Sequence, residues 1–280
     1  MTSSVRNFEN QSQIKSRHFS VKLNSRFFGM VLMAIVLVFA FAEPHFNDVS
    51  PSSQSLLSTL QPPSSEVLLG YDHLGRSMSA RLSAALRLSL TIAFATLMTT
   101  AFIGVTLGVV ASWRGGWIDR LIVLLADSVM AIPALLIVLI AGLILPNQPL
   151  AFWAGLSLTL WIEVFRLTRA TVRAQLAAPA VEASKLLGFG RLYIFRTHLW
   201  PELAPVLTTT FALTFAAVVM GIAALGFVSV GVRAPTPELG SMMVKLLPYW
   251  REAPWALIQP VVATLLTLLA LTLIAGRAGP

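Results

Sequence analysis

The sequence predicts an all-α polytopic membrane protein with six transmembrane helices, a prediction that rests on its composition and its apolar runs. Hydrophobic residues make up 56% of the 280 residues, charged residues make up only 11%, and the mean hydropathy is +0.78. This balance is wrong for a soluble globular protein and typical of a chain that crosses a bilayer several times. There are no cysteines, which excludes disulfide bonds, thiolate nucleophiles and cysteine-based metal sites.

Six apolar runs define the expected spans. They cover 27–42, 88–111, 121–145, 150–165, 206–230 and 255–275. The first run is near the lower limit of about 17 residues for a span. Its end, Ala40-Phe41-Ala42, resembles a signal-peptidase site, so a cleaved signal peptide is the alternative. We favour an uncleaved span, because the 26 residues before it are long for a signal peptide and further spans follow.

The polar stretches orient the chain in the membrane. They are a tail at 1–26, excursions at 43–87 and 233–254, a turn at 112–120, a long stretch at 166–205 and a short end at 276–280. Six spans place both termini on one side, and most of the 20 lysines and arginines then lie on that side. Basic loops stay in the cytoplasm, so we expect both termini there and both excursions outside. The net charge of +8 is explained in the same way, and no nucleic-acid partner is expected.

The second span carries Gly104 and Gly108 in a small-xxx-small pattern. Such a pattern lets a second helix approach closely. We expect it to serve packing within the chain rather than dimerisation.

Residues 178–202, within the long stretch, are too polar to span a bilayer and too regularly patterned to be a linker. We call them the polar segment and expect two short helical pieces hinged at a glycine. Pro179 suits a first helical turn, and Glu182 complements the positive end of the helix dipole. Gly188 can take the left-handed conformation that ends a helix. A basic, amphipathic piece follows and is expected to end at Pro201. A partner outside the membrane is expected to dock on this segment.

Motifs for catalysis are missing from the sequence. The chain has no G-x-x-x-x-G-K-[ST], H-E-x-x-H or G-x-S-x-G motif. Any ATP must therefore be hydrolysed by another chain, and no enzymatic activity or cofactor is expected in this one. The four histidines are far apart in the sequence, which argues against a dedicated histidine metal site.

Two carboxylates lie inside the expected spans. Asp127 shares the third span with Pro133, and Glu163 lies near the end of the fourth span, close to Arg166. Carboxylates within a membrane can mark a proton relay, so a secondary transporter or channel coupled through Asp127 or Glu163 is an alternative. Both are expected near the cytoplasmic ends of their spans, within reach of interfacial water or a basic partner. We therefore favour structural roles.

The spacing within the polar segment resembles the EAA loop of ABC-importer permeases. The residues EAS at 182–184 are followed by Gly188 and Pro201, six and nineteen residues after the glutamate. His198 is typical of the peptide and nickel branch of that family, whereas Trp200 departs from its pattern. The resemblance implies that ATPase subunits dock on the segment. The residues it assigns to this contact are Glu182, Ala183, Ser184, Leu187, Gly188, Arg191, His198 and Pro201.

Three further stretches resemble the same branch. They are GYDHLGR at 70–76, the run from Gly115-Gly116 through Asp119 and Asp127 to Pro133, and APTPELG at 234–240 after Gly226 and Gly231. The external residues that match family motifs are Asp72, Gly75, Arg76, Pro235, Pro237 and Gly240. Four motifs in the family's order are far more specific than any one of them.

The resemblance implies a type I importer permease fold and the C-type member of a permease pair in the bacterial inner membrane. This chain would form half of a pathway for peptides, nickel or a metal-chelate complex. The implied partners are a second permease, two ATP-binding subunits that use ATP and Mg²⁺, an external substrate-binding protein and the lipid bilayer. A membrane scaffold without transport activity is a further alternative.

Overall fold

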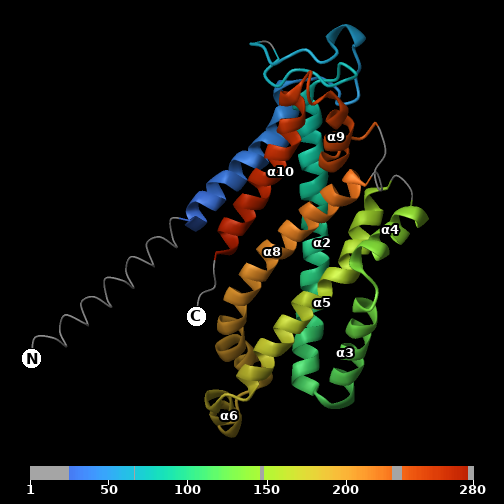
Figure 1. Ribbon diagram of the computed structural model, residues 1–280. Coiled ribbons are helices and arrows are strands. Elements are labelled where there is room, and N and C mark those ends of the chain that lie inside the picture. The colour runs from blue at the N-terminus through green and yellow to red at the C-terminus, as the bar shows by residue number, and fades with distance from the viewer. Residues whose placement is uncertain (1–24, 66, 146–147, 229–234, 277–280) are drawn as a thin grey trace, which may run out of the picture.

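A computed structural model describes residues 25–65, 67–145, 148–228 and 235–276 (Figure 1). Helices dominate this part of the chain, and its only β-type pairing is an isolated bridge between Tyr71 and Ser77. Five helices are long and apolar enough to cross a membrane, and a sixth span results if one bent helix pair counts as a single crossing. The expected all-α polytopic fold is confirmed. Most of the expected tail 1–26 and C-terminal end 276–280, together with Gly231 and Ala234, lie outside the described residues.

The long helices are an N-terminal helix at Ser25–Phe46, α2 at Met78–Arg114, α5 at Pro149–Leu176, α8 at Trp200–Phe227 and α10 at Pro254–Ala275. The shorter helices are α3 at Gly116–Met130, α4 at Ala134–Ile144, α6 at Pro179–Leu186, α7 at Arg191–Ile194 and α9 at Leu239–Leu246. A π-helical turn at Phe195–Leu199 joins α7 to α8, and 3₁₀ turns lie at Leu56–Ser58 and Leu247–Tyr249.

The central helix α2 packs along α5 (Figure 1). A Cβ atom added at Gly104 would lie 2.6 Å from Val164 Cβ, and one added at Gly108 would lie 2.7 Å from Thr168 Cβ. Only glycine, whose side chain is a single hydrogen atom, allows α2 and α5 to come this close. The expectation that the two glycines serve packing within the chain is confirmed.

The expected third span at 121–145 is bent rather than continuous. Helices α3 and α4 meet at 77° across a break of a few residues that ends at Pro133. Proline has no N–H to continue the helical ladder, and its ring clashes with the preceding turn. It also disfavours helical geometry at the residue before it. These two effects explain why the apolar run bends here.

Several helices extend beyond the expected spans. Helix α2 starts at Met78 rather than near residue 88, because Ser77 caps it by accepting a hydrogen bond from the Ala80 N–H at 3.5 Å. The excursion 43–87 is therefore helical in its last part. Helix α5 continues to Leu176 rather than ending near residue 165. Apolar runs mark only the part of a helix suited to the hydrocarbon core, and a helix need not end where its sequence becomes polar.

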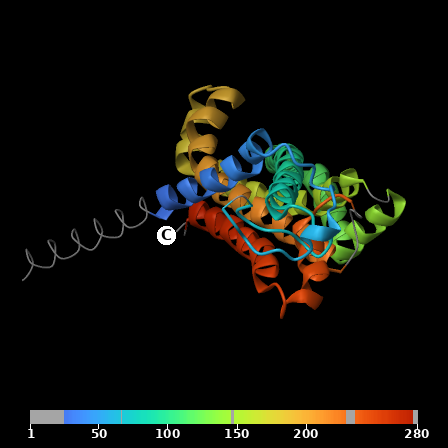
Figure 2. The same ribbon diagram turned by 90° about the horizontal axis from the view of Figure 1, so that it is seen from above.

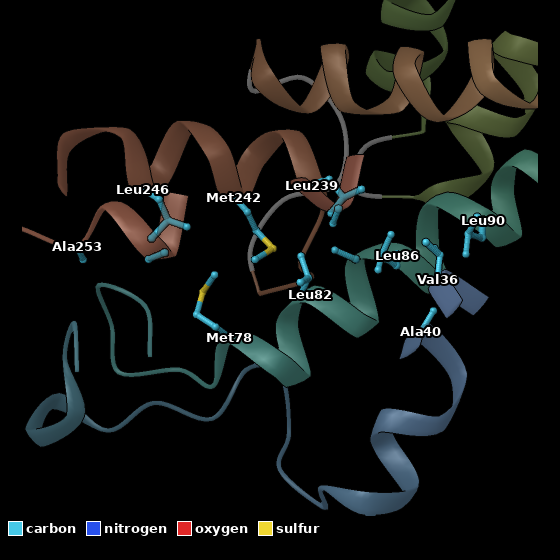
Figure 3. Close-up of a cluster of buried hydrophobic side chains, with 13 residues drawn as sticks. Val36, Ala40, Met78, Leu82, Leu86, Leu90, Leu239, Met242, Leu246 and Ala253 are labelled. Atoms are coloured by element: carbon cyan, nitrogen blue, oxygen red, sulfur yellow. The ribbon is translucent and has the colours of Figure 1, made fainter. Parts of the chain in front are cut away.

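The N-terminal helix and α9 both pack on the first part of α2 (Figure 3). Val36 and Ala40 of the N-terminal helix join a buried cluster with Leu86 of α2, to which Leu239 and Met242 of α9 also belong. The N-terminal helix also lies beside α10 in Figures 1 and 2, and a Cβ added at Gly29 would lie 2.8 Å from Leu273 Cβ. Residues 47–65, 67–77 and 235–253 cover this end of the bundle (Figure 1), and we call them the loop cap.

Candidate functional site

The polar segment lies at the end of the bundle opposite the loop cap, where α6 projects from the helices (Figure 1). Pro179 occupies the first turn of α6, and Glu182 also lies in that turn. Gly188 has φ +84°, and the Gly188 and Phe189 N–H groups donate to Lys185 O and Ser184 O, both at 3.0 Å. This paired arrangement is a Schellman motif, which satisfies carbonyls at the end of a helix. The hinge expected at Gly188 is present.

The second half of the polar segment is not a separate short helix. The chain is helical without interruption from Arg191 to Phe227, so the expectation that Pro201 ends the second piece is wrong. Pro201 lies in the first turn of α8, where its missing N–H is tolerated. A π-helical turn precedes the proline, and in it the Trp200 N–H donates to Phe195 O, five residues earlier. This turn changes the spacing of the backbone hydrogen bonds just before Pro201. Helix α7 therefore continues into α8 without a break.

The two halves of the polar segment are held together by one polar contact and a small core. Ser184 Oγ of α6 lies 2.9 Å from His198 Nε2 of the π-helical turn, and Ser184 also donates to Ala180 O at 2.9 Å. Val181 and Ile194 are buried with Leu199 in a cluster that extends to α5 and α8. Ser184 and His198 were each noted in the sequence, but their contact across the hinge was not foreseen.

The outer face of the polar segment is apolar and unusually exposed. Leu186, Leu187 and Leu192 are exposed, and the exposed rings of Phe189 and Tyr193 stack with their centroids 4.2 Å apart. The exposed charged groups beside them are Glu182, Lys185, Arg191 and Arg196. Ala183, Gly188 and Pro201 are also exposed, whereas Ser184 is buried and His198 is half-buried. Fully burying one such leucine or aromatic side chain stabilises a contact by about 1.5–3 kcal/mol, so this face is suited to docking on a protein.

The motif residues of stretch 70–76 come together in the loop cap. Asp72 Oδ1 accepts from the Leu74 and Arg76 N–H groups at 2.8 and 2.9 Å, and Asp72 Oδ2 accepts from Arg76 Nε at 2.7 Å. Arg81 Nε lies 3.3 Å from the same oxygen, and all three charged side chains are at most 3% exposed. Gly75 has φ +66°, and an added Cβ would lie 1.7 Å from Ser55 O. The stretch therefore forms a buried cluster of paired charges.

The other motif of the loop cap fixes α9 against α8. Glu238 accepts hydrogen bonds from the Gly240 and Ser241 N–H groups, both at 2.7 Å, and so caps α9. A Cβ added at Gly240 would lie 1.8 Å from Ala223 O of α8. Burial raises the pKa of the Glu238 carboxyl. Pro237 is buried and Pro235 is exposed. Nothing in the sequence signals this role, because the side chains preferred directly before a helix are Ser, Thr, Asp and Asn rather than Glu.

The intramembrane residues lie where α3, α4 and α5 meet. Arg166 Nη2 of α5 donates to Asp127 Oδ1 of α3 at 2.6 Å, so Arg166 pairs with Asp127 rather than with Glu163. Glu163 was expected near the end of the fourth span, which is the apolar part of α5, whereas α5 itself runs on from Pro149 to Leu176. It lies near the middle of that helix, and its side chain is exposed. Pro133 is the residue at which α4 begins.

Comparison with known proteins identifies the family of this chain. Residues 103–279 match the family model described as binding-protein-dependent transport system inner membrane component. The chain is 34% identical to the di/tripeptide transport system permease protein DppC of Pseudomonas aeruginosa, over 88% of this chain and 83% of that protein. It is 29% identical to the oligopeptide transport system permease protein OppC of Bacillus subtilis, over 83% and 76% of the two chains. The chain therefore belongs to the family of inner-membrane components of binding-protein-dependent transport systems, and is a permease subunit of an ABC importer.

Proposed function

We propose that this permease carries peptides across the bacterial inner membrane as half of a pathway completed by a second permease. Two ATP-binding subunits dock on the polar segments of the pair, and an external binding protein delivers the substrate to the loop cap. The observation that carries the proposal is the exposed apolar face of the polar segment, which lies beside exposed charged side chains. The positive-inside rule supports a cytoplasmic position for this end, because the long basic stretch contains it.

The local geometry suggests how ATPase movement reaches the pathway. Helix α6 is short and bears Glu182 in its first turn, and the left-handed Gly188 fixes its angle to α7. Because α7 continues into α8, a displacement of the ATPase subunits would move α6 and α8 together. ATP and Mg²⁺ act in the partner subunits. The energy for transport then comes from the different affinities of the inward-open and outward-open states for ATP and for the loaded binding protein.

Peptides are the substrate class that the relatives favour, since DppC and OppC are both named as peptide permeases. Nickel or a metal chelate, which the resemblance also allows, has less support. His73 stacks on Tyr249 with ring centroids 5.3 Å apart, which gives it a structural role in the loop cap. The alternatives of a secondary transporter and a scaffold are set aside, because the matching family is described as an inner membrane component of binding-protein-dependent transport systems.

The experiment uses the assembled importer in proteoliposomes with loaded binding protein outside and ATP inside. We expect Glu182→Lys to abolish ATP-dependent uptake of a labelled dipeptide and to reduce co-purification of the ATPase subunits. Gly188→Asp should reduce both, because it places a carboxylate at the negative end of the α6 dipole. Uptake that persists without the ATPase subunits and collapses with the proton gradient would contradict the proposal.

A matched pair of exposed leucines tests the apolar face itself. Leu192 is 78% exposed in the polar segment, and Leu143 is 79% exposed in α4. We expect Leu192→Ser to weaken ATPase association by about 1.5–3 kcal/mol, because it removes a leucine that the contact buries. Leu143→Ser should leave that association unchanged. Equal effects of the two substitutions would count against the docking role.

A further inference from the structure

A pocket of about 630 Å³ lies where α3 breaks into α4 and faces α5. Val129, Ile132 and Leu160 contribute to its apolar lining, and Thr159, Glu163 and Arg166 supply polar groups. Sites for small molecules typically have volumes of about 300–1,000 Å³ and mostly apolar walls with a few polar groups. The pocket has both properties, and neither the polar segment nor the loop cap forms part of it.

The charges at this pocket do not cancel. Arg166 is already neutralised by Asp127 at 2.6 Å, with both side chains about half exposed at 51% and 54%. Glu163 is exposed and forms no ion pair or hydrogen bond with any residue that the structure describes. The pocket therefore presents one unpaired carboxylate beside a closed ion pair, and it is electrostatically suited to a cation.

The position of these groups argues against a surface facing lipid. Glu163 is fourteen residues after Pro149 and thirteen before Leu176, in the middle of a helix long and apolar enough to span a membrane. Ionisable side chains within a membrane nearly always face the bundle interior or a water-filled cavity. Broken helices at membrane depth likewise occur only where they are buried in protein or line such a cavity. The unpaired carboxylate and the α3–α4 break meet at the same pocket.

We propose that this pocket is a substrate-contact site on the translocation pathway, in which Glu163 attracts the protonated amino group of the passing peptide. The inference rests on the proposed function. The apolar walls accept a side chain of the peptide, while Asp127 keeps Arg166 from repelling the ammonium group. A peptide substrate with a free amino group is thus favoured over a peptide whose amino group is blocked.

The absence of cysteine from the chain gives a direct test. Thr159→Cys places a thiol in the pocket, and Leu158→Cys places one on an exposed neighbour that does not line it. Cysteines are also removed from the other subunits of the assembled importer. The importer is then treated separately with two methanethiosulfonate reagents, one that carries a positively charged trimethylammonium group and one that carries a negatively charged sulfonate group. At Thr159→Cys the measured quantity is the rate of thiol modification by the cationic reagent divided by the rate with the anionic reagent. We expect Glu163→Gln to lower this ratio about tenfold, which corresponds to ~1.4 kcal/mol. Glu163→Asp should preserve the ratio.

The control position distinguishes a local charge effect from a general one. At Leu158→Cys the ratio should not respond to Glu163→Gln. A thiol at Thr159→Cys that neither reagent reaches would overturn the inference, because the pocket would then face lipid or protein rather than the pathway. Loss of the second permease from the purified Glu163→Gln complex would also overturn it, since the carboxylate would then belong to a subunit interface.

Uptake provides the second measurement. With the binding protein saturated by a labelled dipeptide, we expect Glu163→Gln to slow maximal uptake about tenfold, again ~1.4 kcal/mol, and Glu163→Asp to restore most of it. Unchanged uptake in Glu163→Gln would overturn the inference while leaving the proposed function intact. If the unaltered importer takes up no dipeptide, the proposed function itself fails, and the labelling ratios still report whether the pocket selects cations.

Discussion

Replacing Gly188 by alanine tests the hinge of the polar segment through backbone conformation alone. Gly188 has φ +84°, and an added Cβ would meet no atom within 4 Å, so the substitution introduces no clash. A side chain in the left-handed region costs about 1–2 kcal/mol. This strain opposes the Schellman motif that sets the angle between α6 and α7. A strain of that size reduces the population of the docking conformation by a factor of about 5–30.

The assay is the affinity of the ATPase subunits for the permease pair, measured beside uptake per ATP hydrolysed. Apparent affinity falls in proportion to the competent population, so Gly188→Ala should weaken binding by up to about 30-fold. Gly188→Asn should lose less, because asparagine tolerates the left-handed region. Gly190 is the matched control, since it has φ −72° and equally open surroundings, and Gly190→Ala should bind almost normally. Equal binding by the Gly188→Ala and Gly190→Ala importers would refute the reasoning.

Three further substitutions test the packing and the loop cap. Asp72→Asn leaves two buried guanidinium groups without their carboxylate. It should therefore lower the free energy of unfolding, measured by thermal denaturation, by about 3–5 kcal/mol. Asp48 is exposed, and Asp48→Asn should have little effect. Gly108→Leu should separate α2 from α5 and prevent stable purification, while Gly221→Ala, whose Cβ would be 3.5 Å from its nearest neighbour, should be tolerated. Burial lowers the pKa of His73 from its ordinary value of 6.5, so its stabilising contribution is present above that pH and is lost as the pH falls through the lowered pKa. His73→Phe keeps the stacking on Tyr249 and should remove this acid sensitivity from hydrogen exchange of the loop cap, and an unchanged pH profile would assign the sensitivity to another group.

The fold could be predicted from the sequence to the level of its helices, because long apolar runs have few outcomes other than membrane helices. The boundaries could not be predicted as well. Helix α2 begins ten residues before its apolar run, and the extension of α5 places Glu163 near the middle of its helix instead of near the end. The bend at Pro133 was physically foreseeable, but a proline within an apolar run also occurs in helices that only kink.

The candidate site was located by the spacing of Glu182 and Gly188, and local rules explain why. A proline at a helix start, an acidic first turn and a left-handed glycine act within a few residues of one another. Contacts between distant segments leave no such mark in a single sequence. The contact of Ser184 with His198 and the pairing of Asp127 with Arg166 depend on how helices pack, and both required the three-dimensional arrangement.

The central claim is that the polar segment is the surface through which a separate ATPase drives this permease. Its most direct test is site-specific cross-linking in the naturally cysteine-free chain, with Leu187→Cys in the exposed face and Leu143→Cys in α4 as the control. In the assembled importer, Leu187→Cys should cross-link to an ATP-binding subunit, and Leu143→Cys should not. Functional, ATP-driven uptake without any cross-link from Leu187→Cys, or equal cross-linking from both positions, would contradict the claim.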